Sequence, residues 1–191
     1  MRSNGVSYQL ENTMRNLLIV LPLIFLGGCM SLDSKEAAEP YKLDQEWRPL
    51  KDVRERPNIV RNAASKTAST TVGRHIYVHT IDAWLVRYVP GSPKFRALLR
   101  HEQEHSKRQL KMGTFLWIAK YSYDKKFALL EEQIGYFYEI TERRRLGNPI
   151  NIDGVALGLS KYQNLAGRLI SFVEAKQWIL DVLAGRWTPP T

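Results

Sequence analysis

The sequence predicts an α+β fold in which a small antiparallel sheet or hairpin packs on a helix bundle. Residues 74–89 are rich in β-branched and aromatic side chains, and three segments with apolar residues at helical spacing follow them. Hydrophobic residues make up 44% of the chain and charged residues 25%, which is typical of a protein with a folded core. The 191 residues, less an N-terminal segment, suit one domain of ordinary size.

The N-terminal residues predict an export signal. Residues 17–26 form an apolar run that follows Arg15 and precedes two glycines. This run is too short to span a bilayer core of about 30 Å, whereas a basic start, a short apolar stretch and small residues are typical of a secretory signal. Because Met14 would be a normal start for such a signal, we expect residues 1–13 to be an over-extended gene start.

The end of this segment, Leu26-Gly27-Gly28-Cys29, resembles the lipobox of bacterial lipoproteins. The resemblance implies a signal peptide over residues 1–28 and an acylated Cys29, for instance with palmitate, at the start of the mature chain. Cys29 is the only cysteine and cannot form an internal disulfide. Met30 and Ser31 lack the aspartate linked to inner-membrane retention, which favours the outer membrane, facing the periplasm. The alternative is an ordinary signal or membrane-anchoring segment with an incidental cysteine.

The formal net charge of +9 favours an acidic partner. Removing residues 1–28, which hold Arg2, Arg15 and Glu11, leaves a charge of +8. Such an excess can attract anionic lipid, nucleic acid or acidic polymer, and the export signal argues against nucleic acid. The basic residues are scattered, apart from residues 143–145, which lie where they would complement the C-terminus of a helix.

The mature chain divides into a tether and a folded domain. Residues 29–72 begin with Cys29 and hold Ser, Lys, Glu, Pro and Asp in irregular order, which predicts a tether and a loosely structured lead-in. The folded domain is expected at residues 73–191. It begins with residues 74–89, for which we predict two short strands or one bent strand.

Three helices are expected after this β segment. Ser92 can cap the first helix, with proline in the first turn, and this helix runs to about Met112 before Gly113. The second helix starts near Asp124 as N-cap and continues to Arg145. The third is expected over residues 160–184, before the glycine and prolines of the tail.

The first predicted helix contains the sequence His101-Glu102-Gln103-Glu104-His105. Histidines four residues apart lie on one face of a helix about one turn apart, so both imidazoles can bind one ion. Glu102, beside the first histidine, can reach a water bound to that ion. Because a five-residue pattern also arises by chance, an accidental match on a solvated helix face is the alternative.

This HExxH pattern resembles that of the zincin metallopeptidases. The resemblance implies that His101 and His105 are Zn²⁺ ligands, that Glu102 is the general base, and that the substrate is a peptide or protein. A catalytic zinc needs a third protein ligand and keeps one position open for water, whose pKa then falls to about 7.

The second predicted helix offers a third ligand. In the gluzincin group this ligand is a glutamate on a following helix, often within a Glu-x-x-small-Asp pattern. Glu132 and Gly135 match the glutamate and the small residue, but Tyr136 replaces the aspartate, which in the family orients a ligand histidine. That role therefore falls to another group. Glu132 is preferred over Glu131 because Gly135, three residues later, would let the two helices approach closely.

Other residues are weaker candidates. His79 and His75 lie four apart in the β segment, so they should point to one side, where they could line a cleft or donate to an oxyanion; partly exposed strand positions are the alternative. An oxyanion donor could also come from Tyr136, Tyr138 or Tyr162, among which the spacing does not choose. The aromatic residues between the first two helices are expected to form core packing or a cleft wall: Phe115, Trp117, Tyr121 and Tyr123.

The resulting hypothesis is a zinc-dependent peptidase of the bacterial envelope. One alternative is a zinc-binding but non-catalytic outer-membrane lipoprotein that acts as a scaffold or a partner-binding module. Another is a metal-independent envelope or phage-encoded surface protein in which the motif is accidental.

Overall fold

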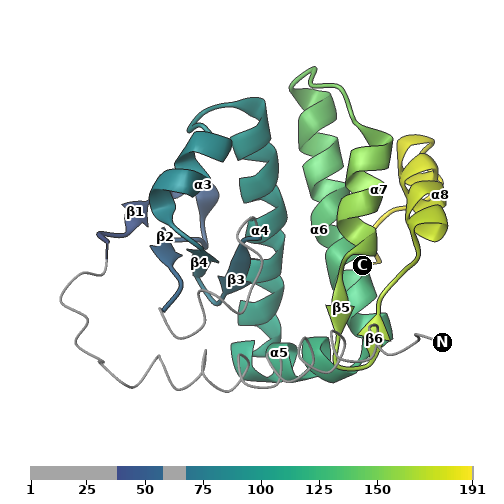
Figure 1. Ribbon diagram of the computed structural model, residues 1–191, viewed down its shortest axis with the longest axis horizontal. Coiled ribbons are helices and arrows are strands. Elements are labelled where there is room, and N and C mark those ends of the chain that lie inside the picture. The colour runs from purple at the N-terminus through teal and green to yellow at the C-terminus, as the bar shows by residue number, and fades with distance from the viewer. Residues whose placement is uncertain (1–37, 58–67, 191) are drawn as a thin grey trace, which may run out of the picture.

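The computed structural model describes residues 38–57 and 68–190, and within them it has the predicted α+β architecture (Figure 1). The strands are β1 (Tyr41–Lys42), β2 (Asp52–Glu55), β3 (Thr70–Val72), β4 (His75–Val78), β5 (Gln163–Asn164) and β6 (Gly167–Arg168). The helices are the 3-10 turn η1 (Gln45–Trp47), α3 (Ile81–Arg87), α4 (Pro93–Met112), α5 (Thr114–Tyr123), α6 (Lys125–Arg145), α7 (Ile152–Ser160) and α8 (Phe172–Leu183).

The expected export signal and Cys29 lie outside the described residues, so lipidation stays a prediction. No helix in the two described ranges combines the length and the apolar composition needed to cross a membrane. From residue 38 onward, the stretch expected to be a loose lead-in contributes β1, β2 and β3. Strands β2 and β3 pair with β4, and β1 pairs with β2. These pairings order the segment, because Val53 lies opposite Ile76 and both side chains are fully buried.

The larger sheet has the strand order β1-β2-β4-β3. Its outer pairs, β1 with β2 and β3 with β4, are antiparallel, whereas the central pair of β2 and β4 is parallel. The sheet is therefore mixed rather than wholly antiparallel as predicted. Parallel neighbours need a crossover connection, and β3 lies between β2 and β4 along the chain.

The prediction of a second strand in residues 74–89 is wrong, because Ile81–Arg87 form helix α3. Its first residue, Ile81, and Trp84 are buried three positions apart, which is the spacing of one helix face, while Val86 is 81% exposed. The aromatic ring of Trp84 packs edge-on against Phe95 of α4. Packing against the sheet and α4 thus overrides the β propensity of the local sequence.

Helices α4 and α6 confirm the first two predicted helices. The Ser92 hydroxyl accepts a hydrogen bond from the Phe95 amide at the start of α4, which ends at Gly113 with a φ of 93°. The Asp124 carboxylate caps α6 in the same way, accepting from the Phe127 amide. Between them the aromatic segment forms another helix, α5, which lies across the end of the α4 and α6 pair (Figure 1).

The prediction of one long third helix is wrong. The chain instead forms α7, a short β5–β6 hairpin and α8. The hairpin turns at Gly167, whose φ of 106° is rarely adopted by residues with a side chain. Helix α8 then starts at a capping box in which the Ser171 hydroxyl and the Glu174 carboxylate each accept from the other residue's amide.

Two apolar clusters lie on either side of the α4 and α6 pair. One joins the sheet, α3 and α4: Trp47, Leu50, Val53, Ile76, Val78, Ile81, Trp84, Phe95 and Leu99. The other joins α6, α7, α8 and the segment before α8: Ile140, Val155, Ala156, Leu159, Ile170, Ala175, Trp178, Ile179 and Val182. Between them, the facing sides of α4 and α6 bury His101, His105, Glu131, Glu132 and Glu139. A polar layer therefore joins two apolar cores, and the predicted site lies in it.

Candidate metal centre

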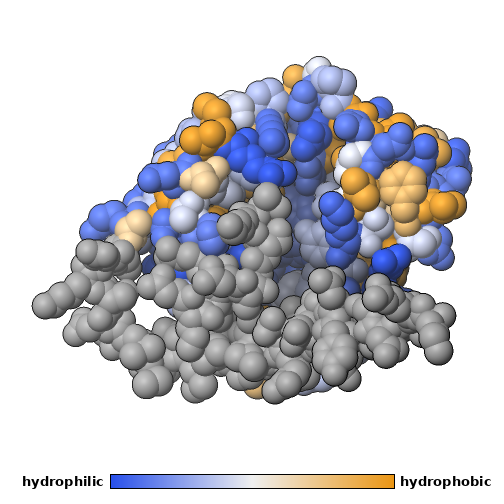
Figure 2. Space-filling view, viewed as in Figure 1, coloured by the Kyte–Doolittle hydropathy of each residue, from blue (hydrophilic) through white to orange (hydrophobic). Residues whose placement is uncertain are grey.

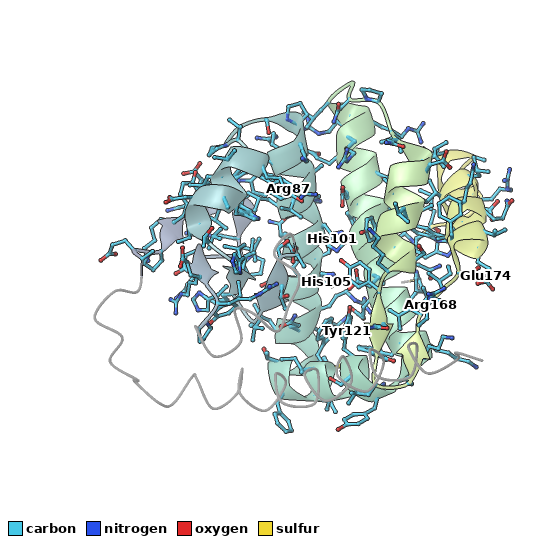
Figure 3. All side chains as sticks on the ribbon, in the orientation of Figure 1. Arg87, His101, His105, Tyr121, Arg168 and Glu174 are labelled. Carbon is cyan, nitrogen blue, oxygen red and sulfur yellow. The ribbon has the colours of Figure 1, made fainter. Side chains whose placement is uncertain are left out.

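His101 and His105 lie one turn apart on α4 and are 4% and 6% exposed. Their Nε2 atoms are 3.0 Å apart, so both rings direct the same nitrogen toward one point. Figure 3 shows both side chains between α4 and the helices that follow it. The one-face arrangement that the sequence predicts is present.

Glu132 reaches the same point from α6. Its Oε2 atom is 3.8 Å from His101 Nε2, and its Oε1 atom is 3.7 Å from His105 Nε2. Two ligand atoms that are each about 2.1 Å from a tetrahedral zinc ion lie about 3.4 Å apart. The separation between the two Nε2 atoms is slightly shorter than this value, and the two separations between nitrogen and carboxylate oxygen are slightly longer. The residues that sequence reasoning selected thus form a group able to hold a metal ion.

Glu131, the other candidate ligand, faces a different partner. Its carboxylate is fully buried and accepts hydrogen bonds from Nε and Nη2 of Arg108, at 2.8 and 2.6 Å. A glutamate neutralised in this way is a structural ion pair. The structure therefore favours Glu132 over Glu131 as the third ligand.

Tyr121 holds Glu132 in place, because its hydroxyl donates a hydrogen bond to Glu132 Oε1. Tyr162 also acts on Glu132, since it lowers the pKa of the carboxyl against the effect of burial. Sequence reasoning assigned Tyr121 to core packing or a cleft wall, because no spacing along the chain links it to a glutamate on the next helix. Of the predicted oxyanion donors, Tyr162 therefore lies at the site, whereas Tyr138 packs under the Arg100 guanidinium at 5.4 Å.

Glu139 is the residue that sequence reasoning missed. Its Oε2 atom lies 3.4 Å from His101 Nδ1, the ring nitrogen that faces away from the candidate metal position. The contact is an ion pair, since Nδ1 has no partner of good hydrogen-bond geometry within the described residues. Glu139 follows Glu132 by seven residues, which is two helical turns, so the same-face rule could have found it. Tyr136 instead packs its ring edge-on against His101.

Glu102, the predicted base, is held by residues at the edge of the sheet. Its carboxylate accepts hydrogen bonds from Ser69 Oγ at 2.9 Å and Thr71 Oγ1 at 2.6 Å. The Gln109 side chain fixes β3 on α4, donating to Thr71 O and accepting from the Gly73 amide. These contacts keep Glu102 beside the histidines, and its charge raises the pKa of both His101 and Glu132.

Burial and neighbouring charges shift the pKa of each candidate ligand. Burial opposes the charged form of His101, but contact with Glu139 and the charges of Glu102 and Glu132 outweigh it and raise its pKa to about 9. Burial raises the pKa of Glu132 to about 7. Burial and the positive charge of His101 hold the pKa of His105 well below its ordinary value.

The charge balance fits a bound cation. Arg108 neutralises Glu131, but the ion-pair partners of Glu132 among the described residues are the two imidazoles. Glu132 Oε2 is buried and accepts no hydrogen bond within the described residues, although desolvating a carboxylate oxygen is costly. A divalent cation between His101, His105 and Glu132 would compensate that cost, and two imidazoles with one carboxylate suit zinc.

The remaining candidate histidines lie outside this group. His79 follows β4, and His75 Nδ1 is 2.6 Å from Asp52 Oδ1 on the neighbouring strand. Among the described residues, the group that could bind a metal comprises His101, His105 and Glu132. His75 therefore has a structural partner, and His79 is not brought to the candidate centre.

Figure 2 shows a hollow between the half of the molecule built on α3 and α4 and the half built on α7 and α8. Hydrophilic residues line much of its rim. Two hollows have volumes of about 470 and about 610 Å³, the first beside Trp47 and Tyr138 and the second beside Asp52 and Arg74. Neither of these two is lined by a candidate ligand.

Comparison of the chain with protein-family models, with curated proteins and with solved structures finds no match in any of the three. The geometry of this site is therefore the basis for a function.

Proposed function

We propose that the protein is a zinc-dependent hydrolase, acting as a peptidase in the bacterial envelope. The observation that carries the proposal is the convergence of His101, His105 and Glu132 on one point, with Glu102 held beside them. Three ligands from the protein leave one coordination position of a tetrahedral zinc for water.

The role of each residue in this proposal follows from the position of its side chain. When bound, zinc lowers the pKa of a water molecule and polarises a carbonyl oxygen. Glu102 accepts a proton from the water that adds to the peptide carbonyl, and returns it to the nitrogen as the carbon–nitrogen bond breaks. Ser69 and Thr71 orient Glu102, and Glu139 orients His101. The products are a carboxylic acid and an amine.

The sequence supports a location for this activity. If Leu26-Gly27-Gly28-Cys29 is a lipobox, acyl chains on Cys29 hold the mature protein at the outer membrane, facing the periplasm. Peptides of the cell wall and other envelope proteins are then the substrates within reach. Mass spectrometry of the mature N-terminus tests this proposal independently of the activity.

A second candidate is a zinc-binding lipoprotein without catalysis. The observation that favours it is the burial of all three ligands, which are between 3% and 6% exposed. Structural zinc sites are closed, whereas catalytic ones keep an open position. In this case the ion joins α4 to α6, and the protein serves as a scaffold or a partner-binding module.

The experiment combines metal analysis with hydrolysis by the full chain. We expect about one zinc per chain, lost in His101→Ala. Glu102→Gln should retain the metal while hydrolysis of a peptide library or of cell-wall peptides falls at least about 100-fold. Glu104→Gln is the matched control, because Glu104 is a buried glutamate of the same helix that pairs with Lys107 at 2.7 Å.

The outcomes separate the candidates. Stoichiometric zinc without hydrolysis in the parent protein would support the scaffold. Unchanged hydrolysis in Glu102→Gln would refute the assigned base. Absence of zinc from the parent would leave the motif accidental and end both proposals.

A further inference from the structure

Helix α5 is apolar on both of its faces. Its inward side buries Trp117, Ile118 and Ser122, which are 5%, 7% and 5% exposed. Its outward side carries Phe115 and Leu116, which are 72% and 54% exposed. A surface helix of a globular domain ordinarily turns polar residues outward, so the outer face of α5 needs an explanation.

The exposed apolar residues of α5 lie on one side of the helix. Phe115 and Tyr123 are eight residues apart, which places them two turns apart on the same face, and Tyr123 is 69% exposed. Leu116 lies beside Phe115, and Leu110, near the end of α4, is 42% exposed. The prediction that Phe115 and Tyr123 form core packing or a cleft wall is therefore wrong. We call Phe115, Leu116 and Tyr123 the α5 face.

Positive charge surrounds the α5 face. Exposed lysines occur at its edge and at the neighbouring helix ends: Lys111, Lys120, Lys125 and Lys126. Asp124 is the only acidic residue in residues 111–126, and its carboxylate caps α6. This segment thus carries a net charge of +3. Aromatic and aliphatic side chains bordered by lysines are typical of segments that lie in a membrane interface.

The position of α5 makes this face accessible to a flat surface. The helix crosses the end of the α4 and α6 pair, at the edge of the fold (Figure 1), and side chains project from it away from the rest of the molecule (Figure 3). Phenylalanine and tyrosine suit the headgroup region of a bilayer, and lysines are attracted to anionic headgroups.

We propose that the α5 face docks on an anionic phospholipid bilayer. Phe115, Leu116 and Tyr123 enter the headgroup region, and the surrounding lysines contact lipid phosphates. The docking fixes the direction of α4, and hence of the metal centre, relative to the membrane. Docking through the α5 face and the lysines around it requires neither hydrolysis nor acylation of Cys29.

A fluorescent label placed on the α5 face tests the proposal in the full chain. In a Cys29→Ser background, Tyr123→Cys supplies one labelling site for an environment-sensitive dye. Val173→Cys, on α8, is the matched control, because Val173 is 75% exposed and likewise apolar. Both proteins are mixed with vesicles of phosphatidylcholine alone or with an equal part of phosphatidylglycerol, carrying nitroxide-labelled lipid as quencher.

We expect a blue shift and quenching at position 123 with phosphatidylglycerol vesicles, and neither at position 173. The signal at position 123 should be lost with phosphatidylcholine alone, and when Phe115→Ser and Leu116→Ser are combined. Equal quenching at both positions, or none at position 123, would overturn the proposal. A concentration-dependent blue shift at position 123 without vesicles would also overturn it, since this face would then bind protein.

Discussion

The imidazole of His101 packs directly against the backbone of Gly135. A Cβ atom at position 135 would lie 2.6 Å from His101 Nε2, the atom that faces the candidate metal position. Contacts this short do not occur, so any side chain at position 135 must displace the ring. Gly135 therefore allows α6 to approach α4 closely enough for Glu132 to reach both histidines.

Gly135→Ala should lower zinc affinity at least about tenfold, because contacts that orient a ligand side chain typically contribute 10- to 100-fold to metal affinity. Alanine is the better helix former by about 1 kcal/mol, so a weakened helix could not explain the loss. Thr141→Ala, at an exposed position of α6, is the control. A competition titration with a zinc chelator measures the effect. Parental affinity in Gly135→Ala would show that His101 is not a ligand.

Glu131→Gln should affect the stability of the protein, whereas Glu132→Gln should affect its zinc binding. Glu132→Gln removes a ligand charge and should abolish stoichiometric zinc binding. Glu131→Gln should keep the zinc but lower the free energy of unfolding by about 1 to 2 kcal/mol, because it removes the negative charge that pairs with the partly exposed Arg108 guanidinium. Metal analysis and urea denaturation of both variants check this pair. Loss of zinc in Glu131→Gln alone would reverse the ligand assignment.

Glu139→Gln should lower zinc affinity by about 10- to 100-fold while leaving about one zinc per chain at saturation. The reason is that Glu139 approaches His101 Nδ1 and favours the orientation in which Nε2 faces the metal. Tyr136→Phe is the control, because it keeps the ring that packs on His101 and removes only the hydroxyl. Isothermal titration calorimetry distinguishes affinity from stoichiometry. An unchanged affinity in Glu139→Gln would rule out its positioning role.

Zinc affinity should rise with pH between about 6 and 8. In the metal-free protein the pKa of His101 is about 9 and that of Glu132 about 7, so both groups carry protons at the acidic end of this range. Zinc binding must displace these protons. In the pH range where a ligand is still protonated, the release of its proton makes the zinc affinity rise about tenfold per pH unit. Chelator competition at three pH values measures the slope. A flat profile would contradict proton displacement at these ligands.

The helix that carries the two candidate histidine ligands could be predicted because its signals are local. The cap at Ser92, the stop at Gly113 and the spacing of His101 and His105 are all contained in one stretch of chain. Local signals failed where packing overrode them. Helix α3 has β-prone residues but buries Trp84 against α4, and the third predicted helix is interrupted by the β5–β6 hairpin.

The amino-acid order alone was enough to predict an α+β chain with two histidines on one helix face and a glutamate nearby. It preferred Glu132 over Glu131 only through the position of Gly135, because the two glutamates are adjacent on the helix and chemically identical. The structural basis of that preference is the packing of α6 on α4, which directs Glu131 to Arg108 and Glu132 to the histidines. The contacts of Tyr121 with Glu132 and of Thr71 with Glu102 likewise join different elements of the fold, so they exist only once those elements have packed together.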